Sequence, residues 1–119
     1  MKINPDVIID EICEYYDIDR FLLKSDSRKR SIIKTKHQCM LFMRVHTDLR
    51  HEDISKYFNR KRANVTHGLK TANNRLFLNS DPEFKKEYYE IKYILTGKRE
   101  PATDEIFMEN DIYENSELL

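Results

Sequence analysis

Residues 47–76 read TDLRHEDISKYFNRKRANVTHGLKTANNRL, and this stretch decides the fold. It predicts a short helix over 51–58, a turn over 59–61 and a second helix over about 62–78. Ile54, Tyr57 and Phe58 are expected to form one buried edge. The other edge follows a helical spacing: Val65, Leu69, Ala72 and Leu76. A short helix, a tight turn and a longer helix with a basic outer face are the organisation of a helix-turn-helix.

Further helices are predicted before this stretch. The first runs over about 5–16, with Asn4 as its cap and Pro5 in its first turn. Its expected core-facing residues are Val7, Ile8, Ile12 and Tyr15. A short helical turn is expected around 19–23, because Phe21 and Leu22 need burial. A long helix follows over about 29–47, and its apolar stripe is Ile32, Thr35, Cys39, Phe42, Met43 and His46.

The last helix is expected over about 81–96. Ser80 and Glu83 have the spacing of a capping box at its start, and Gly97 stops it. Its apolar face is Phe84, Tyr88, Ile91 and Leu95. Residues 98–119 lack helical periodicity. The domain is therefore expected to span 1–97, with a flexible acidic tail over 98–119 that offers a possible protein-docking segment.

The net charge of zero conceals an uneven distribution along the chain. Residues 1–99 hold all 21 Lys and Arg against 14 acidic residues, a balance of +7, and residues 100–119 hold the remaining seven acids. Residues 20–78 hold 15 basic and four acidic residues. Several of these cations begin the long helix, where the helix dipole disfavours them unless an anion such as a phosphate lies nearby. A basic middle with an acidic end is typical of nucleic-acid binding.

Composition excludes several other classes. Two glycines are too few for a Gly-rich nucleotide-binding loop, so no ATPase or dinucleotide enzyme is expected. Cys13 and Cys39 sit among apolar residues and are interpreted as buried thiols. The four histidines have no zinc-ligand spacing with them, so no metal or other cofactor is expected. No apolar run spans a membrane and the N-terminus does not resemble a signal peptide, which favours a cytoplasmic protein.

Four stretches within residues 5–96 resemble the C-terminal DNA-binding domain of the bacterial replication initiator DnaA, in matching order and spacing. They are IIDEICEYYDIDRFLL (8–23), SDSRKRSIIKTKHQCMLFM (25–43), LRHEDISKYFNRKRANVTHGL (49–69) and NSDPEFKKEYYEI (79–91). The resemblance implies an all-α fold of about six helices, of the Trp-repressor-like helix-turn-helix type. It also implies sequence-specific binding of double-stranded DNA, in replication initiation or transcription control, without catalysis.

The resemblance implies roles for individual residues. Arg30 falls on the family arginine that enters the minor groove, and Lys36 and His37 fall on an Arg-Gln pair that grips the DNA backbone. Asn59 replaces a turn glycine. The base-reading segment, Asp-His-Thr-Thr in the family, is Lys-Arg-Ala-Asn at 61–64, so the preferred site is expected to differ. The full expected set is Arg28, Arg30, Lys34, Lys36, His37, Arg60, Lys61, Arg62, Ala63, Asn64, Thr66, His67 and Lys70.

Three alternatives remain at this point. The first alternative is a protein-interaction module on the same fold, which has lost base reading and works through its acidic tail. The second alternative is an enzyme using a pair such as His67 with Asp53 or Tyr88 with Tyr89, although no nucleophile, metal set or cofactor loop accompanies either pair. The third alternative is an RNA-binding protein, for which the sequence lacks aromatic-rich strands. The leading expectation is a free-standing DNA-binding domain without an ATPase.

Overall fold

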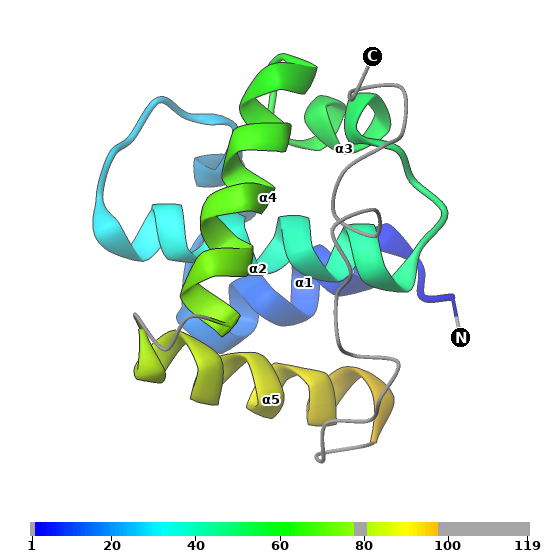
Figure 1. Cartoon of the computed structure of the whole chain (residues 1–119), viewed down its shortest axis with the longest axis vertical. Helices are drawn as coiled ribbons and strands as arrows, with labels where there is room; N and C mark the ends of the chain where they lie inside the picture. The colour runs from blue at the N-terminus through cyan, green and yellow to red at the C-terminus, as the bar shows by residue number, and fades with distance from the viewer. Residues whose placement is uncertain (1, 78–80, 98–119) are drawn as a thin grey trace.

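A computed structural model describes residues 2–77 and 81–97, and these residues form helices with no strand (Figure 1). Five α-helices and one 3₁₀ helix follow one another along the chain: α1 (Pro5–Tyr16), η1 (Arg20–Lys24), α2 (Arg30–His46), α3 (His51–Tyr57), α4 (Arg62–Phe77) and α5 (Pro82–Thr96). The predicted all-α class is confirmed, and each expected helix is present with bounds shifted by one residue at most at nearly every end. The expected tail over 98–119 lies outside the described residues.

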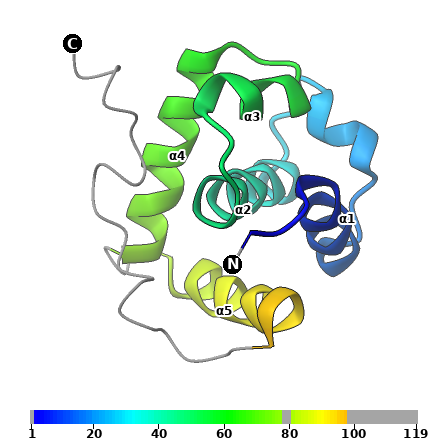
Figure 2. The same cartoon turned by 90° about the vertical axis from the view of Figure 1, so that its right-hand side faces the viewer.

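Helix α2 is the centre of the fold. Seen along its axis, it is surrounded by α1, α3, α4 and α5 (Figure 2). Cys39, Leu41, Phe42 and Met43 are consequently fully buried on several sides of the same helix. The Phe42 ring stacks on Tyr88 of α5 with 4.6 Å between ring centroids. Burial around α2 contributes strongly to stability, because each buried aliphatic or aromatic side chain contributes about 1.5–3 kcal/mol.

Side chains and backbone geometry fix the helix ends. Asn4 Oδ1 accepts the N–H of Asp6 at 2.8 Å and caps α1, as predicted. Gly97 ends α5 in the left-handed conformation at φ 75°, also as predicted. The expected capping box is wrong, because α5 begins at Pro82 and the residue before it, Asp81, is the cap. Its carboxylate accepts the N–H of Phe84 at 3.0 Å.

Burial near the N-terminus differs from the periodicity prediction in two places. Val7 is exposed, and Ile9 takes the core position beside Ile8 and Ile12. In η1, Phe21 is 84% exposed, whereas Leu23 is buried. A 3₁₀ helix has three residues per turn, so only one of three successive residues can face the core. The inference that Phe21 and Leu22 are buried is therefore wrong.

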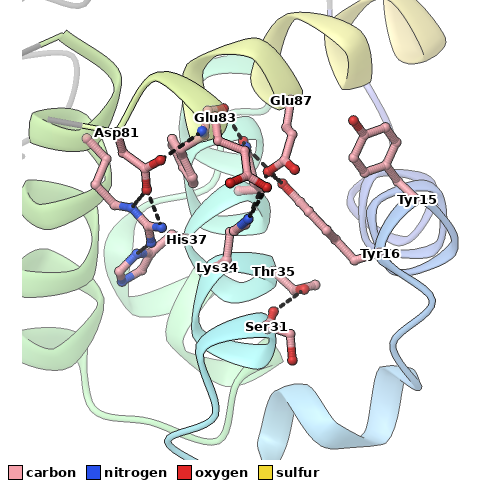
Figure 3. A network of polar contacts seen from close by, with 12 residues as sticks. Tyr15, Tyr16, Ser31, Lys34, Thr35, His37, Asp81, Glu83 and Glu87 are labelled. Carbon is pink, nitrogen blue, oxygen red and sulfur yellow. Dashed lines mark hydrogen bonds and ion pairs between the residues drawn. The ribbon is translucent and has the colours of Figure 1, made fainter. Parts of the chain in front are cut away.

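A polar cluster joins α1, α2 and α5 across one side of the core (Figure 3). The Tyr16 hydroxyl donates to Glu87 Oε1 at 3.0 Å, and the Tyr15 hydroxyl donates to Glu90. Lys34 of α2 lies 3.2 Å from Glu87 Oε1. Burial and the neighbouring carboxylates raise the pKa of both phenols, so both remain protonated donors at neutral pH.

Two features bear on the excluded classes. Cys13 and Cys39 are free and buried, and burial raises the pKa of the Cys13 thiol to about 11. They are unreactive core residues, as predicted. Within residues 2–77 and 81–97, no cluster of His, Cys and acidic side chains has the makings of a metal site, and no helix has the length and apolar character needed to cross a membrane.

Candidate nucleic-acid interface

The turn between α3 and α4 is fixed by backbone hydrogen bonds. The N–H of Arg60 donates to the Ser55 carbonyl at 3.1 Å, and the N–H of Phe58 donates to the same oxygen at 3.2 Å. Asn59 lies between them at φ 53°, in the left-handed region that glycine favours and asparagine tolerates. This arrangement ends α3 with a Schellman-type turn. It explains how asparagine serves at a position where the resembling family has glycine.

Helix α4 begins immediately after this turn and presents its first residues to solvent. The Lys61 carbonyl accepts the N–H of Asn64 at 3.0 Å and that of Val65 at 3.4 Å. Residues 61–64 are all exposed, whereas Val65 is fully buried and anchors the segment. Thr66 Oγ1 lies 2.9 Å from Nδ1 of the buried His51, which links the second turn of α4 to α3.

A basic loop over residues 25–29 lies next to the turn, and one backbone oxygen holds the two together. The Ser25 carbonyl accepts Lys36 Nζ at 2.9 Å and Arg60 Nη2 at 2.5 Å. Arg60 also pairs with Asp26 at 3.0 Å. Burial and the nearby Arg60 charge lower the pKa of Lys36. The loop that carries Arg28 is thus tied both to α2 and to the helix-turn-helix.

The starts of α2 and α4 differ in charge from those of the other α-helices. The first turns of α1, α3 and α5 each contain acidic residues, which suit the positive end of a helix dipole. The first turns of α2 and α4 contain none. Instead, Lys29 and Arg30 begin α2, and Lys61 and Arg62 begin α4, all exposed. Cations at these positions are electrostatically unfavourable in isolation and become favourable when an anion binds between them.

His37 lies where α2 and α4 cross. Gly68 lies at this crossing, where a Cβ would approach Met40 Sδ to 2.8 Å and the Met40 side chain would have to shift. The half-buried ring of His37 has its Nδ1 3.1 Å from Arg75 Nη1. Burial and the Arg75 charge lower the pKa of His37 to about 4. The imidazole is therefore neutral at physiological pH.

The structure brings most of the expected residues together around the loop and α4. The exposed ones are Arg28, Arg30, Lys61, Arg62, Ala63, Asn64, His67 and Lys70. His37, Arg60 and Thr66 are half-buried, and Lys36 is buried. Lys34 points elsewhere, into the polar cluster, where it pairs with Glu83 at 3.4 Å as well as with Glu87. Sequence reasoning missed the roles of Ser25 and Arg75, because a backbone acceptor and a contact between distant helices leave no local pattern.

Comparison with known proteins assigns the family. The family described as "Bacterial dnaA protein helix-turn-helix" matches residues 5–71, which are more than half of the chain. This chain belongs to that family. The matched residues include α1, α2, α3 and the first two-thirds of α4, whereas α5 and the end of α4 lie beyond them.

Several curated relatives are chromosomal replication initiator proteins DnaA. That of Oleidesulfovibrio alaskensis is 39% identical over 67 residues, which are 56% of this chain and 14% of the relative. That of Bacteroides thetaiotaomicron is 29% identical over 97 residues, 81% of this chain and 20% of the relative. This chain therefore spans about a fifth or less of the length of these relatives. No solved structure matches it.

Proposed function

We propose that this chain binds double-stranded DNA through its helix-turn-helix, recognises a particular sequence and acts in replication initiation or transcription control in the cytoplasm. The observation that carries the proposal is the pair of cationic helix starts, at Arg30 and at Lys61–Arg62, joined through the Ser25 carbonyl. Phosphates on either side of a groove are the anions that such a surface fits. Residues 1–97 form the binding domain in this proposal.

The positions of the side chains suggest a division of labour. Arg62 and Asn64 occupy the first turn of α4, where side chains reach base edges in the major groove. Arginine pairs bidentately with guanine and asparagine with adenine, each worth about 1–3 kcal/mol of discrimination. Lys61 and Lys70 contact phosphates and add affinity without specificity. Arg30, at the start of α2, enters the adjacent minor groove.

Two other expected residues hold the loop rather than the DNA. The ammonium of Lys36 and the guanidinium of Arg60 are already occupied by Ser25, and Arg60 also by Asp26. Their contribution in this proposal is to fix the loop, and with it Arg28 and Arg30, against the turn. Lys34 is left out of the interface, because its ion pairs with α5 point it into the polar cluster.

Selection from a random pool of duplexes tests the proposal, followed by competition between the selected site and a scrambled duplex. Arg62→Ala and Asn64→Ala are each expected to lower the ratio of specific to non-specific affinity by about tenfold. Lys61→Ala is the matched control, and it should weaken binding to both duplexes about equally. Equal weakening of both duplexes by Arg62→Ala refutes the base-reading role of Arg62. No enrichment from the pool favours the alternative, a protein-interaction module that works through its acidic residues 100–119.

A further inference from the structure

Arg75, in the last turn of α4, lies beyond the residues that match the family and is held rigidly by the start of α5. Its Nε and Nη2 donate to Asp81 Oδ2 at 2.9 and 2.6 Å. Its guanidinium carbon lies 4.6 Å from the centre of the Phe84 ring. With these contacts in place, Nη1 is the part of the guanidinium that points toward His37, and Figure 3 shows His37 and Asp81 close together at this junction.

The contact between Arg75 and His37 determines where the imidazole carries its hydrogen. A guanidinium has only donors, so at 3.1 Å from Nη1 the Nδ1 atom of His37 must be the acceptor. A neutral imidazole has one N–H, which in this ring must therefore be on Nε2. Burial and the Arg75 charge keep the ring neutral, with a pKa of about 4.

Nε2 is the nitrogen of His37 that Arg75 does not contact in this hydrogen bond. The His37 side chain is half-buried, so part of its surface is exposed, and the Nε2–H is the group of this ring that can donate to a ligand. The titratable groups around the ring are Arg75 and His67 from α4 and Lys36 from α2, and Asp81 of α5 is paired with Arg75. A half-buried ring that lies beside the charges of Arg75 and Lys36 and has an N–H to donate suits an anionic acceptor.

We propose that Arg75 is a positioning residue for DNA binding: it locks His37 into the tautomer whose Nε2–H donates to a phosphate oxygen. This inference rests on the proposed function and extends it into α5, since Asp81 and Phe84 orient Arg75. A neutral N–H donor gives a directional contact and releases no counterion. His37 therefore contributes affinity that is independent of salt, unlike the exposed cations around it.

Long-range ¹H–¹⁵N correlation spectra of the DNA-free protein test the first half of the proposal. The expected spectrum of His37 shows a protonated Nε2 and an unprotonated Nδ1 throughout pH 5.5–8. In Arg75→Met, the tautomers should mix, because nothing then requires Nδ1 to accept. A protonated Nδ1 in the unaltered chain, or an unchanged single tautomer in Arg75→Met, overturns the proposal. The spectrum of the unaltered chain decides the point even where Arg75→Met folds poorly.

A double-mutant cycle tests the second half on the selected duplex. Arg75→Met and His37→Leu are each expected to weaken binding about three- to tenfold, the range for one hydrogen bond. Arg75→Met should then cost nothing further in the His37→Leu background. His37→Gln should retain affinity, because its amide accepts from Arg75 and still donates outward. Lys86→Met removes an exposed cation of α5 away from His37 and is the control for charge alone.

The outcomes separate this inference from the proposed function. A cost of Arg75→Met that persists in the His37→Leu background shows that Arg75 acts through charge or stability, and refutes its positioning role. A loss of affinity in Lys86→Met equal to that in Arg75→Met would also refute the positioning role of Arg75. Failure of the unaltered chain to bind any duplex refutes the proposed function and the phosphate contact together, while the spectra still report the tautomer.

Discussion

The dependence of DNA binding on salt should be steep, and its slope can be worked out from the structure. Six exposed cations lie on the loop, at the start of α2 and along α4: Arg28, Lys29, Arg30, Lys61, Arg62 and Lys70. Each phosphate contact adds about −0.9 to the slope of log K against log salt, so six contacts give a slope of about −5. Affinity should then fall roughly a thousandfold between 50 and 200 mM salt.

Single substitutions should divide into two groups in this measurement. Lys61→Ala should make the slope less steep by about 0.9, because one counterion fewer is released. Lys86→Ala removes another exposed cation, but α5 lies at the opposite end of α4 from Lys61, so the slope should not change (Figure 1). Lys34→Met should also leave the slope unchanged, because Lys34 is paired with Glu83 and Glu87.

Fluorescence anisotropy with a labelled duplex, titrated at five salt concentrations, gives each slope directly. A flat plot for the unaltered chain contradicts DNA binding through this surface. A change in slope for Lys86→Ala as large as that for Lys61→Ala would show that the cations act through net charge alone. The assignment of the interface to the loop and α4 would then be wrong.

Three further predictions concern other parts of the chain. Asn59→Ala should destabilise the fold by about 1 kcal/mol, since alanine tolerates the left-handed turn less well, and Asn59→Gly should not; thermal melts followed by circular dichroism distinguish them. Truncation after Gly97 removes seven acidic residues and should tighten non-specific binding at low salt; unchanged affinity argues against competition by this segment. Burial alone would raise the pKa of Asp81, but hydrogen bonds from Arg75 and the Phe84 N–H lower it overall. The stability that ionised Asp81 contributes is thus present above its unfolded pKa of 3.8 and is lost as the pH falls further. Asp81→Asn should therefore make the free energy of unfolding depend less on pH on the acid side.

Helix positions were predictable from the sequence because apolar spacing and local capping residues are short-range signals. Val65, Leu69, Ala72 and Leu76 recur at helical spacing, and all are buried as predicted. Short elements carry less information. Three consecutive apolar residues in η1 have no period that distinguishes the buried Leu23 from the exposed Phe21. Only the packing of η1 against α1 and α2 decides between them.

The positions of the cations in the candidate interface were partly predictable, whereas their contacts within the protein were not. Basic residues before α2 and at the start of α4 stand out in the sequence because they occupy unfavourable ends of helices. Lys34 and Lys36 look equivalent in sequence, two residues apart on one helix. Their partners are an acidic pair on α5, 49 or more residues away, and the Ser25 backbone oxygen. Neither partner is visible in a local pattern.

The shared carbonyl of Ser25 links the two parts of the proposed interface. Lys36 and Arg60 both donate to this atom, so hydrogen bonds join the loop before α2 to the turn before α4. In the proposed complex, Arg30 and the first turn of α4 then contact the duplex at two places held at a fixed separation by the protein. Each base pair inserted between the two contacted regions shifts one of them by about 3.4 Å and rotates it by roughly 35° around the duplex axis. Two contacts held at a fixed separation cannot follow that rotation. Target sites should therefore tolerate base changes between the two contacted regions far better than changes in the number of base pairs.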